Sequence, residues 1–138
     1  MSLYCLIYTS ISNQKFSEDD LKKLLQKSRI KNKAKGVTGL LLYLDPYFLQ
    51  VLEGEEHIVN QSFHEISTDI RHNKITLIYR QPLEKLKFPD WSMGFNKADV
   101  TKIDGFSEFL KQPSPEFSKN FQDAIEELLD MFKHETLF

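Results

Sequence analysis

The sequence predicts an α+β domain in which two helices cover one face of a β-sheet. Three observations support this fold class. Short apolar segments typical of strands are interleaved with two segments of helical periodicity. Hydrophobic residues make up 41% of the 138 residues and charged residues 28%, which is enough apolar material for one folded core. A glycine or proline stands near the ends of several of these segments, where regular elements usually stop.

The first strand is expected from Leu3 to Thr9. Leu6 and Tyr8 share one face of this strand, and Ile7 lies on the other. Both faces are apolar, as in a central strand that is covered on two sides.

The first helix is expected between Ser17 and Gly36. Ser17 and Asp20 resemble a capping box, although the usual partner three residues after the serine is Glu or Gln. Leu21 and Leu25 lie on the apolar stripe of this helix, and Gly36 ends it. Cations suit the end of a helix because they complement its dipole. Basic residues crowd this end: Lys27, Arg29, Lys31, Lys33 and Lys35.

The remaining elements are strands at 37–44 and 48–53 joined by a hairpin turn, a helix at 55–70, and strands at 75–79 and 91–95. Gly54 is expected to end the second strand of the hairpin, and Pro82 and Pro89 bound an irregular segment. The buried stripe of the second helix is expected at Val59, Phe63, Ile66 and Ile70.

This βαββαββ order is the ferredoxin-like α+β pattern with one added strand. In such a sheet we expect the first and third strands to lie side by side and parallel, under two helices on one face. The crossover connections should be right-handed.

The charge divides the chain into two parts. Residues 1–96 carry a balance of +2 and are interpreted as the core domain, whereas residues 97–138 carry −4 and are interpreted as a C-terminal helical extension. An apolar stripe in this extension needs a partner, which predicts a homo-oligomer unless the stripe packs on the open face of its own sheet. The stripe consists of Phe117, Phe121, Ile125, Leu128 and Phe132.

Composition excludes several classes of protein. The net charge of −2 argues against a general nucleic-acid binder, which normally carries a large basic excess. The single cysteine, Cys5, excludes a disulfide framework and a cysteine-rich zinc site, and the four histidines form no obvious metal pair. No apolar run reaches the length of a membrane span, and no signal peptide is recognised. We therefore expect a cytoplasmic protein without a metal and without a membrane or nucleic-acid partner.

Three polar residues stand where apolar ones would be expected. Tyr8 lies on an apolar face of the central strand, Gln50 shares a strand face with Phe48 and Leu52, and Asn32 lies near the end of the first helix. A buried amide without partners costs roughly 1–3 kcal/mol, so something must satisfy these groups. If the first and third strands are neighbours, Tyr8 and Gln50 can meet under the helices, and a purely structural bond between them remains open.

Five separated segments carry a resemblance to a known family. They are Leu6–Tyr8, Ser28–Asn32 leading into Gly36–Leu41, Phe48–Gly54, Ile66–His72 and Trp91–Met93. They occur in order and at matching spacing within residues 3 to about 96. In this combination the chain resembles the BLUF family, the flavin-binding sensors of blue light. The fold of that family is the ferredoxin-like arrangement expected above.

The resemblance implies a flavin bound non-covalently between the two helices, usually FAD, although FMN or riboflavin can fit. It places Tyr8 and Gln50 against the flavin and Asn32 at its pyrimidine edge. That edge presents a carbonyl beside an N–H, and one amide can answer both. The other implied flavin contacts are Leu25, Lys31, Ile66, Asp69, Arg71 and His72.

Some of these positions also have ordinary interpretations. Leu25 and Ile66 suit a hydrophobic core, and Arg71 either touches the ribityl phosphate or is simply solvated. Lys31 departs from the His or Asn often found there. The basic run from Lys27 to Lys35 either attracts the cofactor phosphates or forms a solvated helix end.

The resemblance also implies a photochemical role for a few residues. Tyr8 would donate an electron and a proton after light absorption, and Gln50 would reverse its hydrogen bonds by rotation or tautomerisation. Trp91 and Met93 would pass this change outward. The C-terminal extension resembles no enzymatic output domain, so the chain is interpreted as a short stand-alone sensor and not an enzyme. It would signal by association with itself or with an unidentified downstream protein.

Two other classes of protein compete with this interpretation. An acyl-phosphate hydrolase of the same fold would need an arginine cradle in the first loop, and Thr9–Phe16 contains no arginine. A flavin-free ferredoxin-like interaction domain is the alternative. It is disfavoured because the chain combines all the implied switch and relay residues: Tyr8, Asn32, Gln50, Trp91 and Met93.

Overall fold

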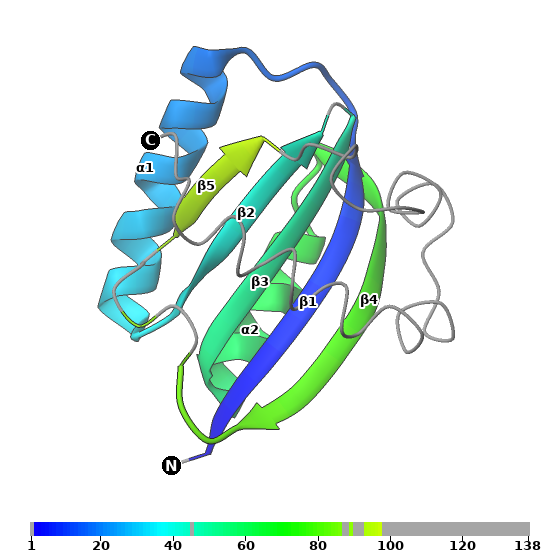
Figure 1. Ribbon diagram of the computed structural model, residues 1–138. Coiled ribbons are helices and arrows are strands. Elements are labelled where there is room, and N and C mark those ends of the chain that lie inside the picture. Colours follow the sequence, from blue (N-terminus) through cyan, green and yellow to red (C-terminus); the bar gives the residue numbers. More distant parts are fainter. Residues whose placement is uncertain (1, 45, 87–88, 90–92, 98–138) are drawn as a thin grey trace.

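A five-stranded sheet in the order β4-β1-β3-β2-β5 organises the computed structural model, with both helices on one face (Figure 1). The structure describes residues 2–44, 46–86, 89 and 93–97. The elements are β1 (Leu3–Ser12), α1 (Glu18–Lys35), β2 (Thr38–Leu44), β3 (Tyr47–Glu55), α2 (Glu56–Ser67), β4 (His72–Leu83) and β5 (Gly94–Lys97). The predicted ferredoxin-like α+β class, with its added fifth strand, is confirmed.

The central strands β1 and β3 are neighbours, as predicted, but they are antiparallel and not parallel. The reason lies in the connections. The crossover through α1 carries the chain past one strand position and makes β2 run in the direction of β1. The tight hairpin that follows reverses the chain, so β3 fills the gap between them in the opposite direction. The parallel pair in this sheet is β2 with β5.

The two faces of β1 are both buried, as the sequence predicted for a central strand. Leu6 and Tyr8 belong to the main core under the helices, whereas Cys5 and Ile7 are buried on the alternate positions. From the helices, Leu21 and Leu25 of α1 and Val59 of α2 complete this core. Burial of such side chains contributes roughly 1.5–3 kcal/mol each, which fixes the helices on this face of the sheet.

Local signals set the limits of α1. The Ser17 hydroxyl accepts the backbone N–H of Asp20 at 3.1 Å, and the Asp20 carboxylate accepts that of Ser17 at 3.1 Å, which confirms the capping box. Gly36 ends the helix in the left-handed conformation with φ 74°, and its N–H donates to the carbonyl of Asn32. The Val37 N–H donates to the same carbonyl at 2.9 Å.

The second helix is shorter than predicted. It ends at Ser67, and the prediction that Ile70 belongs to its buried stripe is wrong because Ile70 is 89% exposed. Val59 is fully buried, and Phe63 and Ile66 pack partly buried against the core. The apolar spacing predicted a helix that continues to residue 70. In the structure, the segment after Ser67 turns toward β4 instead.

The outer strands also differ from the prediction. β4 runs from His72 to Leu83, well beyond the predicted 75–79, and Pro82 lies inside it. A proline is tolerated there because β4 is the edge of the sheet, where one side of the strand needs no N–H donors. The prediction that Gly54 ends β3 is wrong, because β3 continues through Gly54 to Glu55. The last strand, β5, is Gly94–Lys97 and shares residues 94 and 95 with the predicted strand at 91–95, of which residues 91 and 92 lie outside the described part.

Some predictions concern residues outside the described part of the chain. These are Trp91 and residues 98–138, which include nearly all of the predicted C-terminal extension and its apolar stripe. The division at residue 96 therefore stays a prediction. In the described part, no helix is long and apolar enough to span a membrane.

Candidate functional site

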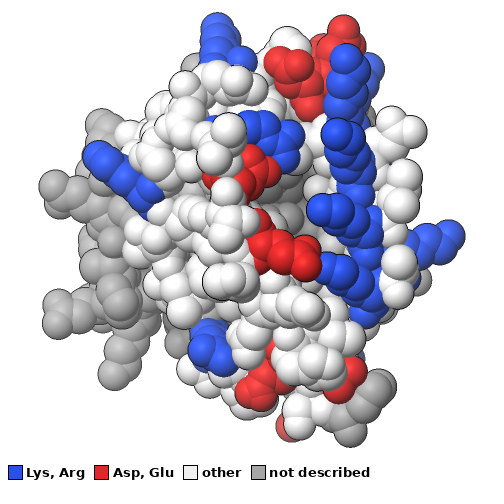
Figure 2. Space-filling model, turned by 180° about the vertical axis from the view of Figure 1, so that it is seen from behind, with Lys and Arg blue, Asp and Glu red and all other residues white. Residues whose placement is uncertain are grey.

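A cavity of about 190 Å³ opens between α1, α2 and the sheet. In the space-filling view of that side, a hollow lies beside a column of cationic side chains (Figure 2). A space of roughly 10–15 Å³ holds one water molecule, so this cavity is large enough for a small organic molecule. It is lined by Tyr8, Phe16, Leu24, Lys27, Ser28, Lys31, Asn32, Lys35, Leu41, Phe48, Gln50, Ser62, Glu65, Ile66, Asp69, Arg71 and His72.

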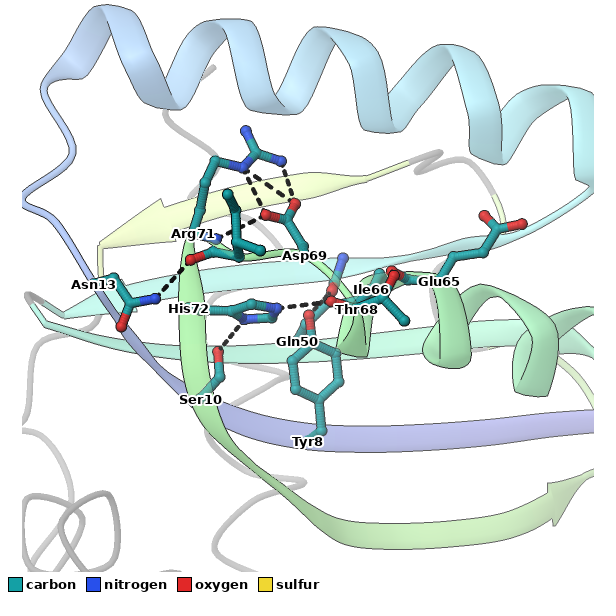
Figure 3. A network of polar contacts seen from close by, with 11 residues as sticks. Tyr8, Ser10, Asn13, Gln50, Glu65, Ile66, Thr68, Asp69, Arg71 and His72 are labelled. Carbon is teal, nitrogen blue, oxygen red and sulfur yellow. Dashed lines mark hydrogen bonds and ion pairs between the residues drawn. The ribbon is translucent and has the colours of Figure 1, made fainter.

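Tyr8 and Gln50 meet at this cavity (Figure 3). They are direct register partners in β1 and β3, and the Tyr8 phenol donates a hydrogen bond to Oε1 of Gln50. The predicted meeting of these two side chains under the helices is confirmed. Burial raises the pKa of the Tyr8 phenol far above its usual value, and the negative charge of Asp69 raises it further. The phenol is therefore a neutral donor over the whole physiological pH range.

The other end of the Gln50 amide faces a sulfur atom. Its Nε2 donates to the thioether of Met93 at 3.5 Å, and Met93 is completely buried. The backbone carbonyl of Met93 in turn accepts a hydrogen bond from Nε of Arg29 at 2.8 Å. Burial lowers the pKa of the Arg29 guanidinium, although it remains a cation. These contacts thus connect Gln50, through Met93, to Arg29 of α1 and to the start of β5.

Asn32 is held by the end of α1. Its backbone carbonyl accepts the two N–H groups that close the helix, from Gly36 and Val37, so its position on the cavity wall is fixed by the helix cap. The residue is buried and lines the cavity. An amide at this position offers a donor and an acceptor to a ligand.

His72 is fixed through both ring nitrogens (Figure 3). Nε2 lies 2.8 Å from the carbonyl of Ile66 and therefore donates to it, because a carbonyl oxygen only accepts. Nδ1 lies 2.8 Å from the hydroxyl of Ser10. In the neutral ring Nδ1 accepts from that hydroxyl. The ring thereby ties the end of α2 to β1 beside the Tyr8 ring, whose centre lies 6.4 Å away.

Two ion pairs stand at the cavity. Asp69 accepts from Nε of Arg71 at 3.0 Å, and this side-chain hydrogen bond lowers the pKa of Asp69 to about 2. The same interaction raises the pKa of Arg71. Lys35 of α1 reaches Glu65 of α2 at 3.1 Å, which links the two helices across the cavity.

Most of the residues that the resemblance implied lie together. Tyr8, Lys31, Asn32, Gln50, Ile66, Asp69, Arg71 and His72 all line the cavity. Leu25 does not: it is fully buried in the core, and the neighbouring Leu24 lines the cavity in its place. Leu24 and Leu25 are adjacent on the apolar stripe of α1. The rotation of the helix, which depends on its packing, decides that Leu25 enters the core and Leu24 lines the cavity.

Ser62 was missed by the sequence analysis. It is 6% exposed, lines the cavity, and its hydroxyl has no hydrogen-bond partner among the described residues. An unsatisfied buried hydroxyl costs roughly 1–3 kcal/mol, so a polar ligand in the cavity would relieve this cost. A serine inside a helix carries no sequence signal for such a role.

The lining fits a flavin ring. Apolar side chains such as Leu24, Phe48 and Ile66 suit the faces and edges of an aromatic ring system, and the amides of Asn32 and Gln50 suit its polar edge. The described residues contain no group of three or more His, Cys, Asp or Glu side chains that would hold a metal ion.

Comparisons with known proteins agree with this site. The family described as sensors of blue light using FAD matches residues 3–94. Photoactivated adenylate cyclase subunit alpha of Euglena gracilis is 31% identical over 116 residues, which cover 82% of this chain and 11% of that protein. The beta subunit from the same organism is 30% identical over 99 residues, covering 71% of this chain and 12% of that protein. The chain thus spans only about a tenth of the length of these relatives.

Solved structures resemble the whole fold. The photo-activated state of BlsA superposes with a TM-score of 0.75 at 27% identity, covering 96% of this chain and 95% of that one. The dark-state structure of BlrB, a BLUF protein, superposes with a TM-score of 0.72 at 31% identity, covering 83% and 88%. With the family match over two thirds of its length, the chain belongs to the BLUF family, the flavin-based sensors of blue light.

Proposed function

We propose that this chain is a blue-light photoreceptor that binds flavin non-covalently in the cavity between α1 and α2, and that Tyr8 and Gln50 carry its light response. The observation that carries this proposal is the buried phenol–amide hydrogen bond at the cavity. A donor, a reversible amide and a space for a ring system are thereby combined in one place.

A bound flavin would supply the absorption of blue light and an electron acceptor. The protein supplies the donor and its proton path. Tyr8 is neutral, and its O–H already points at Oε1 of Gln50, so a proton that leaves the phenol has an acceptor within hydrogen-bond distance. Gln50 has a donor end and an acceptor end, and rotation or tautomerisation exchanges what it offers to its neighbours.

The cofactor would be FAD, FMN or riboflavin, since the ring is common to all three. Asn32 would bind the polar edge of the ring, and Ile66 would pack on it. The side chains of Asp69 and His72 would line its outer edge, and Arg71 would touch the ribityl phosphate, as the resemblance implies. The hydroxyl of Ser62 would gain the partner that the described residues do not provide.

The change at Gln50 would leave the site through Met93. The thioether contact and the bond from Arg29 to the Met93 carbonyl support this route. Trp91, the other implied relay residue, lies outside the described residues. The output would be altered association of the chain with itself or with a downstream protein in the cytoplasm, as opposed to turnover of a substrate.

The proposal is tested by a light-minus-dark absorption difference spectrum of the purified, flavin-loaded protein. We expect a reversible shift of the flavin band to longer wavelength, and we expect Tyr8→Phe to abolish it because the electron and proton donor is removed. Tyr4→Phe is the matched control: Tyr4 lies on the same strand, packs against Arg80 and does not line the cavity. It should keep the shift.

Two results would contradict the proposal in different ways. A protein that stays colourless after reconstitution with flavin nucleotides would refute flavin binding and favour the flavin-free interaction domain. A normal, reversible shift in Tyr8→Phe would leave flavin binding intact and refute the role of Tyr8.

A further inference from the structure

His72 reaches the helix side of the sheet through an irregularity in β4. In a regular strand, residues three apart point to opposite faces. Ile75 nevertheless packs against the core under the helices, and His72, three residues earlier, contacts Ile66 of α2. Between these two positions the register of β1 and β4 shifts by one residue, and Lys74 has a φ of 50°. This bulge turns His72 from the far face of the sheet toward the helices.

Ser10 fixes which nitrogen of the ring carries the proton. Its hydroxyl lies 2.8 Å from Nδ1, and the residue is 2% exposed. Because the hydroxyl donates to Nδ1, this nitrogen is the acceptor of the neutral ring and the proton stays on Nε2. Ser10 belongs to the central strand β1, so the ring is anchored to the sheet.

The other nitrogen of the ring holds the last turn of α2. Nε2 donates to the Ile66 carbonyl at 2.8 Å, and the backbone N–H of Asp69 donates to the same oxygen at 3.0 Å. Carbonyls in the last turn of a helix have no partner within the helix, so these two donors satisfy one of them. The side chain of Ile66 lines the cavity. The bond that fixes its carbonyl therefore also fixes where this side chain stands.

Both ring nitrogens are thereby occupied by groups of the protein (Figure 3). A neutral imidazole has one donor and one acceptor, and Ile66 and Ser10 take them. The ring lines the cavity but keeps no hydrogen-bonding group for a ligand. Its effect on a ligand must therefore pass through a neighbouring residue.

We infer that His72 is a positioning residue of the flavin site. Held in one tautomer by Ser10, it sets Ile66 of α2 against the flavin ring, and it forms no hydrogen bond to the flavin itself. This inference rests on the proposed function, because Ile66 needs a ring in the cavity on which to pack. The distance between the sheet and the end of α2 is then set by two hydrogen bonds to one side chain.

The test is a double-mutant cycle on the dissociation constant of riboflavin, measured with the flavin-free protein by quenching of flavin fluorescence. His72→Phe keeps a ring but loses both hydrogen bonds, so we expect roughly fivefold weaker binding. Ile66→Ala keeps the carbonyl and its bond from His72 but removes the side chain that this bond positions. In the Ile66→Ala background, His72→Phe should therefore change the dissociation constant less than about twofold.

Conservative variants identify which bond matters. The amide nitrogen of glutamine is as many bonds from Cα as Nε2 of histidine, so His72→Gln can keep the bond to Ile66 and should restore most of the affinity. The amide of asparagine reaches only the place of Nδ1, so His72→Asn should bind as weakly as His72→Phe. His64→Phe is the matched control, at an exposed position of α2 that does not line the cavity, and should bind normally.

The tautomer is measured without any ligand. In ¹⁵N NMR spectra of the flavin-free protein, we expect the neutral ring of His72 to carry its proton on Nε2. Ser10→Ala removes the donor to Nδ1, so both tautomers should become populated and riboflavin should bind about twofold more weakly. An unchanged tautomer in Ser10→Ala would refute the part assigned to Ser10.

The binding results separate this inference from the function beneath it. An equal loss of affinity from His72→Phe with and without the Ile66 side chain, or a failure of His72→Gln to bind better than His72→Asn, would overturn the positioning role while leaving flavin binding in place. Failure of the unaltered protein to bind riboflavin, FMN and FAD would overturn the proposed function as well.

Discussion

The Tyr8 phenol is placed where its proton cannot go to solvent. The side chain is 3% exposed, its hydroxyl is occupied by Gln50, and its ring packs on Phe63 with centres 5.3 Å apart. Burial penalises the phenolate, and the neighbouring Asp69 carboxylate adds to that penalty, so the pKa of Tyr8 is raised. The proton of Tyr8 is thus available to Gln50 and not to bulk base.

We expect the stability of the fold to depend on pH through Asp69, because the hydrogen bond from Arg71 lowers the pKa of this carboxyl to about 2. A carboxyl whose pKa is lower in the folded state stabilises that state above its unfolded pKa of about 4, and this contribution is lost as the pH falls toward 2. Because both side chains are partly exposed, the contribution should be below about 1 kcal/mol.

Urea unfolding of the flavin-free protein at several pH values between 5 and 2 measures this contribution. The free energy of unfolding should be lower in Asp69→Asn than in the unaltered protein at about pH 5, and the difference should vanish near pH 2. Arg71→Gln should show the same behaviour, since it removes the same pair. A difference that does not change with pH would show that the pair is not its cause.

At the scale of elements, α1 serves both the fold and the site. Leu21 and Leu25 face the sheet, and the same helix presents Lys27, Lys31 and Asn32 to the cavity. Its Arg29 reaches the carbonyl of Met93. The capping box and the glycine cap fix where this helix begins and ends. They thereby help to fix the position of each of these side chains relative to the sheet.

The hairpin of β2 and β3 depends on a close backbone approach at Gly39. A Cβ atom placed there would lie 1.9 Å from the carbonyl oxygen of Val51, which is part of β3 and cannot move without breaking the ladder. We expect Gly39→Ala to destabilise the fold severely, or to shift β3 and with it Gln50. The lowering of the thermal unfolding midpoint measures this effect.

Gly36→Ala is the matched comparison for Gly39. Gly36 has a φ of 74°, which disfavours alanine, but nothing lies within 4 Å of an added Cβ. Its cost should be about 1 kcal/mol, from backbone strain alone. If Gly39→Ala costs no more than Gly36→Ala, the close approach is not what requires glycine at 39.

At the scale of the molecule, the sequence predicted the elements and their order because the apolar patterns of β1, α1 and the hairpin are unambiguous. It did not predict the direction of β3 relative to β1, because adjacency follows from the fold class whereas direction depends on how the crossover and hairpin combine. Ile70 was assigned to a helix face because spacing continues past the residue where the helix actually ends.

The site was predictable to a similar degree. Polar residues on apolar strand faces pointed to Tyr8 and Gln50, and Asn32 was noted where the first helix ends. The resemblance added the other candidate contacts: Leu25, Lys31, Ile66, Asp69, Arg71 and His72. Ser62 gave no signal, because a serine in a helix looks like any other surface residue until its burial is known. The choice between Leu24 and Leu25 needed the actual rotation of the helix.

The predicted self-association is also a property of the whole molecule. The apolar stripe that led to this prediction lies in residues outside the described part. If this stripe forms the interface, deleting residues 112–138 should convert an oligomer into a monomer, as measured by the mass in solution. An unchanged oligomer after this deletion would exclude the tail as the interface.

The thioether of Met93 at the nitrogen end of Gln50 has an energetic consequence. Sulfur is a weak acceptor, so it favours the present amide orientation only slightly. Turned end for end, the amide would set its oxygen against the sulfur, a mild penalty compared with facing a carboxylate or carbonyl. In the proposed light response, the sulfur contact would therefore oppose inversion of the amide only slightly, and the main bond to be exchanged would be that from the Tyr8 phenol to Oε1.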